Sequence, residues 1–562
     1  MTSDVAPRRF AALLALIVVV AVLLRALFPT ADPPWRASVG VFWHDEGAWT
    51  HNARNRALYG AWTQDEWNPM YIAPVFTGLE YASFALFGVG LRQARLVSEV
   101  AGVVSVLLIA LGVADLSNRR AGLIAGGLLA TNYVYVMYDR AALMEATMIA
   151  FIVAAWYGFV RAQRSAPWGL VSAAAALLAY FSKAAAAFFV VALGLEAVLR
   201  LRDPDAARRR AAWWTLAGLA VAAAVSLAVL VGPHWSEYRF YNIQISVMRK
   251  PSYDLKSLKD RLTWFPILHD LFTRMWLVTV VGVLSALGAL VRWTRLGPGE
   301  RLLLLWLGLG ALQLIVHDVG NERYLTYLIP GLVAMAALAL GRDRRLLPPE
   351  AGAIGRERAL LFAPVIFYAL YVVCGAIARL LFLYEPGPGV RLSAAIAAVL
   401  GALTYLSWPW LPRRLSRDRW SLGASLLLAA IVVTGDVVQF VQWAGDRTYE
   451  NYDAMRLIDR LLPPDTLVHG KLANGLALEN RIRPVFVGHG FGNYADRRAR
   501  DDVRYILTYV APRIGYEGDQ ILEVLDAYPQ WRIVTTFPVA ETAGGHDRAA
   551  LIDKYGGAGT AR

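Results

Sequence analysis

Long runs of apolar residues, separated by short polar stretches, fill most of this chain. A helix of about 20 apolar residues spans the ~30 Å hydrocarbon core of a bilayer. The pattern therefore predicts a polytopic α-helical membrane protein with about 13 transmembrane helices, which together form a domain over residues 1–444. The predicted spans are 10–28, 93–114, 121–138, 143–160, 167–181, 184–200, 211–232, 275–293, 301–316, 324–341, 359–383, 391–410 and 420–443.

The segment 71–88 is apolar too, but it contains Pro74 and Glu80 and is expected to lie along the outer membrane surface. The first span follows Arg8 and Arg9 and is predicted to be an uncleaved anchor with a cytoplasmic N-terminus. With these two choices the loops predicted to be cytoplasmic are all rich in arginine, as the positive-inside rule requires. They are 118–120, 161–164, 200–210, 292–301, 341–345 with 356–358, and 412–419.

From about residue 445 the pattern becomes that of a soluble domain, which we expect on the extracytoplasmic side. Short apolar runs alternate with helical patterns, which predicts a small α/β domain over 445–562 with a largely parallel sheet. A glycine-rich turn, GHGFG (488–492), follows one predicted strand. It lacks the GxGxxG spacing and a following lysine, so a plain turn is favoured over a phosphate-binding loop. The predicted strands are 466–469, 484–487, 503–509 and 531–537, and the predicted helices are 449–462, 471–480 and 519–527.

Composition supports the membrane class. Apolar residues make up 57% of 562 positions and the mean hydropathy is +0.43, whereas soluble domains are roughly 45–50% apolar. The net charge of +13 comes from the arginine clusters between the spans, so the topology explains it and nucleic acid is not an expected partner. A single cysteine, Cys374, excludes an intramolecular disulfide and a zinc site built on cysteines.

The predicted topology places the unusual polar residues on the outer face, beginning with FWHDEGAWTHNARN at 42–55. Asp45 and Glu46 are adjacent carboxylates close to a membrane exit, where their repulsion must be offset by a metal, a cation or a substrate proton. The alternative, without a functional role, is a solvent-exposed loop that carries two surface acids. Asp45 is the candidate general base, and Glu46 is its polar neighbour or a metal ligand. His44 is a metal ligand, a headgroup donor or a structural hydrogen-bond donor.

A second outer loop contributes Asp139 and Glu145 together with Arg140. Arginine binds phosphate oxygens through two parallel hydrogen bonds, although Arg140 taken alone is explained equally well as a residue that snorkels at a helix end. Lys183 ends a small-residue span and is the first lysine in the chain, which favours phosphate binding over snorkelling.

Arg323 and Tyr324 lie at the outer end of a later predicted span, as Lys183 does at the end of an earlier one. Two loops therefore contribute carboxylates, and three loops contribute cations, to the same face of the membrane. That combination suits a phosphate leaving group and an acceptor hydroxyl or amine that must lose a proton. A lipid phosphate carrying a sugar is the natural substrate class, because its tail can lie between helices.

The order of these features resembles the GT-C membrane glycosyltransferases, in particular the protein O-mannosyltransferases and the lipid A aminoarabinose transferase. The resemblance covers roughly residues 10–340, and the placement of the C-terminal domain matches the aminoarabinose transferase. It implies a polyprenyl-phosphate sugar donor, Asp45 as the base, and the lysine and arginines as ligands of the donor phosphate. The matching elements are the pair Asp45–Glu46, Glu145 in RAALMEA with Asp139 nearby, Lys183 in SKAAAA, PHWSEYRFYNIQ after the seventh span, and RYLTYLIP.

The chain departs from the aminoarabinose transferase at Trp67-Asn68-Pro69, where that enzyme has Glu-Lys-Pro, so a lysine expected near the phosphates is missing. The acceptor stays open between a protein, a lipid and a polysaccharide. A divalent metal stays open as well, with Asp45 and Glu145 as its ligands if one is bound. Membrane lipids are the other expected partners. The rival functions are a transporter or flippase for a lipid-linked sugar and a structural assembly subunit.

Overall fold

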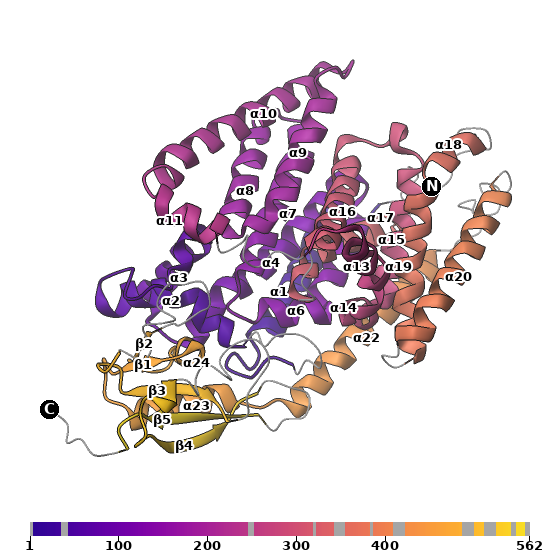
Figure 1. The fold of residues 1–562 in the computed structure, drawn as a ribbon. Helices are drawn as coiled ribbons and strands as arrows, with labels where there is room; N and C mark the ends of the chain where they lie inside the picture. The colour runs from indigo at the N-terminus through magenta and orange to yellow at the C-terminus, as the bar shows by residue number, and fades with distance from the viewer. Residues whose placement is uncertain are drawn as a thin grey trace.

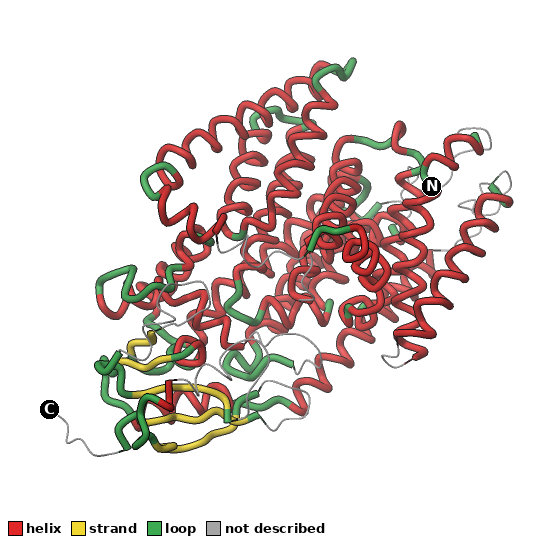
Figure 2. Tube along the Cα trace, in the orientation of Figure 1, coloured by secondary structure: helices red, strands yellow, loops and turns green. Residues whose placement is uncertain are grey.

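Long helices run side by side through most of the molecule, and a small sheet lies at one of their ends (Figure 1). The computed structural model describes residues 4–34, 43–244, 252–317, 322–341, 355–382, 386–408, 422–485, 500–510, 524–540 and 547–556. Helix dominates the described residues up to Asp446, and the strands of the described part all come after it (Figure 2).

Each of the predicted spans contains a helix in the structure. Among the described residues, nine helices are long and apolar enough to cross a membrane, or up to eleven if each of two bent pairs is one span. Helix α8 is apolar but shorter, with 15 residues. The fold class predicted from the sequence is therefore confirmed. The helices are α1 (Pro7–Ala26), α4 (Leu91–Leu116), α5 (Arg119–Thr131), α6 (Tyr133–Asp139), α7 (Met144–Ala162), α8 (Trp168–Ser182), α9 (Ala187–Arg200), α10 (Ala206–Ser226), α13 (Leu255–Leu268), α14 (Asp270–Arg274), α15 (Trp276–Leu290), α16 (Pro298–His317), α17 (Ile329–Leu340), α18 (Arg356–Leu361), α19 (Ala363–Phe382), α20 (Pro386–Leu406) and α22 (Leu422–Asp446).

The core of the helical part lies where α4, α5, α7 and α17 pack together. Trp156 and Trp306 are fully buried there. Because burial shields each indole N–H from solvent, it needs a hydrogen-bond acceptor within the protein. Trp156 donates to the carbonyl of Gly299 at 3.1 Å, and Trp306 donates to the carbonyl of Tyr327 at 2.9 Å. These bonds tie α7 to α16, and α16 to the segment that precedes α17.

Several helices of the bundle are interrupted at or next to polar residues. Helices α5 and α6 meet at 61°, and Asn132 at the junction caps α6 by accepting the N–H of Tyr135 at 3.0 Å. Helix α8 ends because Lys183 adopts an extended backbone conformation, and the three-ten turn η2 (Ala184–Ala186) then leads into α9. A three-ten helix, η6 (Glu322–Leu328), precedes α17. The breaks place polar residues at the sheet end of the bundle.

The segment between α1 and α4 lies at that end of the bundle, beside the sheet domain (Figure 1). It contains α2 (Trp43–Tyr59), η1 (Pro69–Tyr71) and α3 (Pro74–Phe87). A helix of 14 residues such as α3 is about 21 Å long and falls short of a bilayer crossing. Helix α10 continues through η3 (Leu227–Val231) and α11 (Trp235–Arg239) into η4 (Phe240–Gln244), where the Tyr241 hydroxyl accepts the N–H of Asn68 at 3.0 Å.

The C-terminal part begins with α23 (Glu450–Leu461) and forms a five-stranded sheet of order β2-β1-β3-β5-β4. The four predicted strands are present, but the prediction of a largely parallel sheet is wrong. β1 pairs in parallel with β2 and β3, whereas β5 pairs antiparallel with β3 and β4. The sequence analysis missed β5, because Ala and Leu in its RAALID run favour helix. Residues 488–492 and 519–523 lie outside the described residues. The elements are β1 (Leu467–His469), α24 (Lys471–Gly475), β2 (Arg483–Val485), β3 (Tyr505–Tyr509), β4 (Arg532–Pro538) and β5 (Arg548–Asp553).

Candidate active site

Asp45 lies in the first turn of α2 and forms an ion pair with Arg323, which η6 brings to it from far along the chain. The ring of His44 is next to this pair, with its Nε2 3.7 Å from Oδ1 of Asp45. The side chain of Asp45 keeps 14% of its surface exposed, whereas that of Arg323 keeps 8%. A base that is to meet a substrate needs such residual access, and Asp45 has it.

Glu145, in the first turn of α7, is the second acid of this group. It forms an ion pair with Lys183, and its Oε1 lies 3.2 Å from Nε of Arg323. Tyr324 lies beneath both cations, with its ring centre 4.2 Å from Nζ of Lys183 and 5.3 Å from Cζ of Arg323. Arg323 therefore bridges Asp45 and Glu145, and we call Asp45, Glu145, Lys183, Arg323 and Tyr324 the Asp45 cluster.

The two acids of the Asp45 cluster differ in access. Glu145 is 2% exposed, and Lys183 is 13% exposed. The buried acid is thus suited to hold the two cations in place, while Asp45 and Lys183 can contact a substrate. Because each cation carries several N–H donors, both can share them between a carboxylate and a phosphate.

Glu46 belongs to a different cluster, although it follows Asp45 directly. Its two carboxylate oxygens accept Nε and Nη2 of Arg95, each at 2.8 Å, and Oε1 also accepts the N–H of Ala142 at 2.8 Å. Arg95 in turn donates to the carbonyls of Pro29 and Ala31 at 3.0 and 2.7 Å. Glu46 thereby connects α2, α4 and the ends of α1 and α6, and the structure does not bring it to Asp45's partners.

Asp139 and Arg140 also lie apart from the Asp45 cluster. Asp139 is 1% exposed and accepts Nε and Nη2 of Arg25 at 3.0 and 2.7 Å. Arg140 donates to the carbonyls of Leu24, Arg25 and Phe28, and its guanidinium lies 4.6 Å from the ring centre of Trp443. Both residues thus hold the end of α1. Arg140 is buried, so snorkelling, the alternative for this residue, does not describe it, whereas substrate binding by Asp139 and Arg140 stays a prediction.

Three charged residues that the sequence analysis did not select support this region: Arg25, Arg95 and Glu80. Each could have been found from one signal, since a charge within an apolar segment needs a partner nearby. Arg25 forms an ion pair with Asp139, and Arg95 forms one with Glu46. Glu80 on α3 is fully buried, and neither of its oxygens has a hydrogen-bond partner within the part of the chain that is described.

Burial, together with repulsion from Glu46, raises the pKa of Glu80 well above its ordinary value of 4.5. A carboxyl whose pKa is raised by folding gives its full stabilisation below the unfolded pKa, and this is lost as pH rises through the folded pKa. Glu80→Gln removes that titration. We expect the melting temperature of the wild type to fall relative to that of Glu80→Gln as pH rises above 4.5. An exposed control, Glu357→Gln, should leave the slope unchanged. Equal slopes for wild type and Glu80→Gln would contradict this.

No group of three or more His, Cys, Asp or Glu side chains that could hold a metal ion occurs among the residues placed by the structure. Asp45 and Glu145, the two acids expected as metal ligands, are joined through Arg323. Arg323, together with Lys183 beside Glu145, therefore offsets their charge in this structure.

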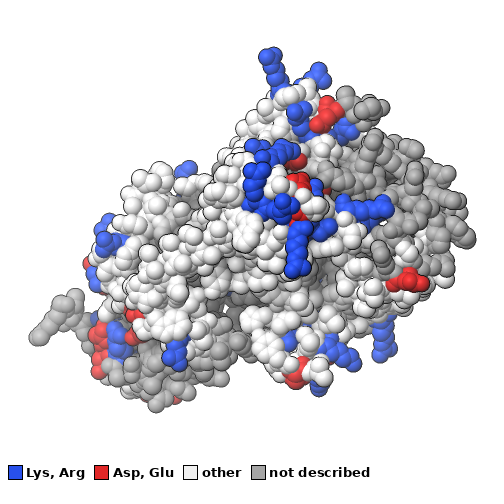
Figure 3. Space-filling model, turned by 90° about the horizontal axis from the view of Figure 1, so that it is seen from above, with Lys and Arg blue, Asp and Glu red and all other residues white. Residues whose placement is uncertain are grey.

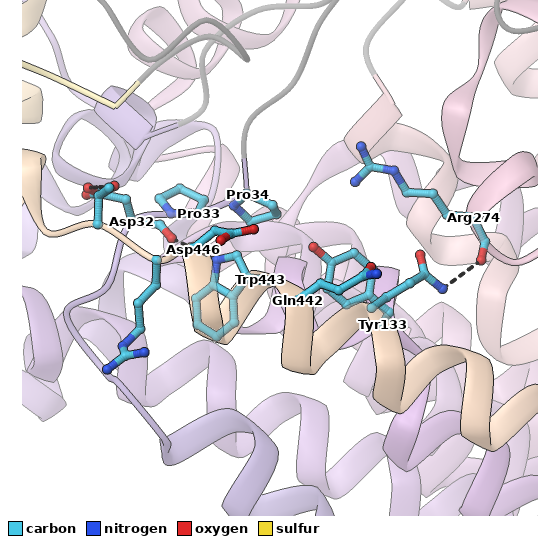
Figure 4. Close-up of a pocket in the computed structure, with 11 residues that line it drawn as sticks. Asp32, Pro33, Pro34, Tyr133, Arg274, Gln442, Trp443 and Asp446 are labelled. Atoms are coloured by element: carbon cyan, nitrogen blue, oxygen red, sulfur yellow. Dashed lines mark hydrogen bonds between the residues drawn. The ribbon is translucent and has the colours of Figure 1, made fainter.

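A cavity of about 260 Å³ lies near η6, between the end of α22, the start of α6 and the end of α14. Figure 4 shows Arg274 on the side of this space opposite Asp446 and Pro34, with its side chain pointing toward them. Arg274 forms an ion pair with Asp270 at 3.2 Å, and the N–H of Asp270 donates to Glu322, the neighbour of Arg323, at 2.5 Å. The cavity is thus linked to the Asp45 cluster through η6 but contains none of its residues.

Comparisons with known proteins agree with this architecture. Residues 72–231 match the family described as dolichyl-phosphate-mannose-protein mannosyltransferase. The crystal structure of ArnT from Cupriavidus metallidurans in the apo state is similar over 98% of this chain and 99% of that chain, with 14% identity and a TM-score of 0.59. The structure of the same protein bound to undecaprenyl phosphate gives 97% and 98% coverage, 15% identity and a TM-score of 0.57. No curated protein sequence matches the chain.

The fold and the matched segment define the class of this protein: it is a polytopic membrane protein with the fold of the GT-C glycosyltransferases. The GT-C fold that the resemblance implied is therefore confirmed, and the match of residues 72–231 agrees with the expected enzyme class, a glycosyltransferase of the GT-C type.

Proposed function

We propose that this chain transfers a sugar from a polyprenyl-phosphate donor to an acceptor on the extracytoplasmic face of the membrane, with Asp45 as the general base. The observation that carries the proposal is the Asp45 cluster. It places one accessible carboxylate against two cations, at an end of the helical bundle where a lipid phosphate and a polar acceptor can meet.

The donor class is supported by the comparisons and by the cations. The matching family is described by a dolichyl-phosphate sugar, and ArnT has been crystallised with undecaprenyl phosphate. In this chain Lys183 and Arg323 are the cations suited to hold a phosphate, because both belong to the Asp45 cluster. Their charge favours the leaving polyprenyl phosphate, on which negative charge increases as the bond to the sugar breaks.

The chemical step assigns one role to each part of the Asp45 cluster. An acceptor hydroxyl or amine attacks the anomeric carbon of the donor sugar, and the bond from that carbon to the phosphate oxygen breaks. The acceptor proton passes to Asp45, and the electron pair of the broken bond leaves with the phosphate, which Lys183 and Arg323 hold. Glu145 is buried, so its role is to position these cations rather than to accept the proton.

The proposed side of the membrane rests on the arginines. Figure 3 looks onto the end of the molecule opposite the sheet domain and shows mainly Lys and Arg among its charged side chains. At that end Arg119 donates to the carbonyl of Val5, and Arg161 and Arg164 pair with Asp115. An arginine-rich end is typical of the cytoplasmic side, which supports an extracytoplasmic position for the Asp45 cluster and the C-terminal domain.

The proposal is tested with the purified chain in sealed, oriented liposomes that contain a labelled polyprenyl-phosphate sugar and cell-envelope extract as acceptor. Donor consumption and release of polyprenyl phosphate are expected only when the acceptor is on the side that contains Asp45. A label that crosses the membrane while still attached to its lipid would support a flippase instead and contradict the proposal.

A further inference from the structure

The C-terminal domain contacts α2 at the turn that carries Asp45. A Cβ added to Gly47 would lie 1.9 Å from the carbonyl oxygen of Asn474, and one added to Gly475 would lie 2.5 Å from Cβ of His44. Both distances are far below an ordinary van der Waals contact of 3.4–4 Å. Two glycines, one from each part of the chain, thus allow the backbones of α24 and α2 to touch beside Asp45.

Further contacts continue along α2 and fix its direction. Arg54 is 1% exposed and donates to the carbonyls of Ala477, Asn480 and Ile482 at 2.9–3.0 Å. The amide of Asn474 lies 3.0 Å from Nδ1 of His51, whose Nε2 lies 2.9 Å from Asp65. Buried polar groups of α2 are thus satisfied by the C-terminal domain.

We infer that the Asn474–Gly475 turn of α24 is a positioning element for catalysis, which sets the location of Asp45 relative to Arg323. The inference rests on the proposed function, because it concerns the base of that reaction. It assigns the C-terminal domain a role in the active site, although that domain supplies no residue to the Asp45 cluster. On this account the turn acts through His44 and Gly47, the two neighbours that flank Asp45 and Glu46.

The physical reason is the tightness of the contact. A methyl group at Gly475 meets the Cβ and Cα of His44 at 2.5 and 2.7 Å, so one backbone must move by about 1 Å to restore an ordinary contact. The Cα atom cannot rotate away as the end of a side chain would. A shift of about 1 Å at a reacting group can reduce the rate about 100-fold, because attack requires close alignment.

The test is Gly475→Ala, with Ile552→Ala as a control that weakens the same domain on a sheet face packed against Tyr528 rather than against α24. Gly475→Ala should lower kcat about 10- to 100-fold and leave the KM for the polyprenyl-phosphate sugar unchanged. Ile552→Ala should lower the melting temperature and leave kcat unchanged. Gly47→Ala approaches the same contact from the other side, so its effect and that of Gly475→Ala should be less than additive in the double variant.

Hydrogen exchange of the 43–50 segment gives a readout that does not need activity. Exchange should be faster in Gly475→Ala than in the wild type or Ile552→Ala, because the first turn of α2 has lost its support. If Gly475→Ala does not fold, Asn474→Ala keeps the backbone contact, loses the bond to His51, and should lower kcat several-fold. Normal kcat in a folded Gly475→Ala protein, or unchanged exchange at 43–50, would overturn the inference. A wild type that transfers no sugar would instead refute the proposed function.

Discussion

Asp45→Asn is expected to lower sugar transfer by about 10²- to 10⁴-fold, the usual contribution of a general base. The amide has the shape of the carboxylate and can still accept a hydrogen bond from Arg323, so the fold should survive. The base is lost, because an amide does not take up a proton near neutral pH. The measurement is transfer of labelled sugar from a polyprenyl-phosphate donor in liposomes, with expression and melting temperature checked for each variant.

The donor affinity distinguishes the roles within the Asp45 cluster. Asp45→Asn should change the KM for the donor little, whereas Lys183→Ala should weaken donor use about tenfold or more, because a charge-assisted bond to phosphate contributes roughly 1.5–3 kcal/mol. The exposed Lys259→Ala is the matched control. Normal turnover in a folded Asp45→Asn protein would remove Asp45 from the mechanism, and Glu145 or Asp139 would be tested next.

Glu46→Gln is expected to destabilise the protein by roughly 3–5 kcal/mol, the usual result of breaking a buried ion pair from one side. The glutamine leaves the guanidinium of Arg95, which is 3% exposed, without its countercharge. The melting temperature should therefore fall strongly, while the turnover of the molecules that remain folded should fall less than in Asp45→Asn. Two adjacent acids would then separate into a chemical role and a structural one.

Arg95 provides the control for this second experiment. The double variant Glu46→Gln/Arg95→Met removes both charges and should recover part of the lost stability, since neutral groups of similar size can replace a buried ion pair at little cost. Unchanged melting of Glu46→Gln together with lost turnover would show instead that Glu46 acts in the reaction. Loss of activity on chelation in the wild type would point to a metal at this acid.

The sequence predicted the spans and the members of the Asp45 cluster, because apolar length and isolated charges are local signals. It could not separate Glu46 from Asp45. Neighbours on a helix point about 100° apart, so adjacent acids on α2 reach different partners. Nor could the sequence show that Asp139 and Arg140, which were predicted to bind substrate, contact the end of α1. Their partners, the Arg25 side chain and the carbonyls of Leu24, Arg25 and Phe28, lie more than 110 residues earlier in the chain.

In the C-terminal part, the predicted strands were found because β-branched and aromatic residues alternate along them. The strand β5 was missed, and its antiparallel pairing depends on a chain reversal that strand patterns do not encode. The contact of Gly475 with His44 was likewise invisible in the sequence. A glycine in LANGL is typical of any helix end, and only the approach of α2 shows why a larger residue would not fit.

The buried Arg54 has a consequence for how the protein is made. Its three carbonyl partners lie 423 to 428 residues later in the chain, so they are synthesised long after Arg54 itself. Until then the guanidinium has to stay in water, because burying it alone is costly. The first turn of α2 thus cannot settle against α24 while the intervening spans are still entering the bilayer. A nascent chain that has already folded α1 to α10 therefore still lacks the contacts of α2 with residues 477–482.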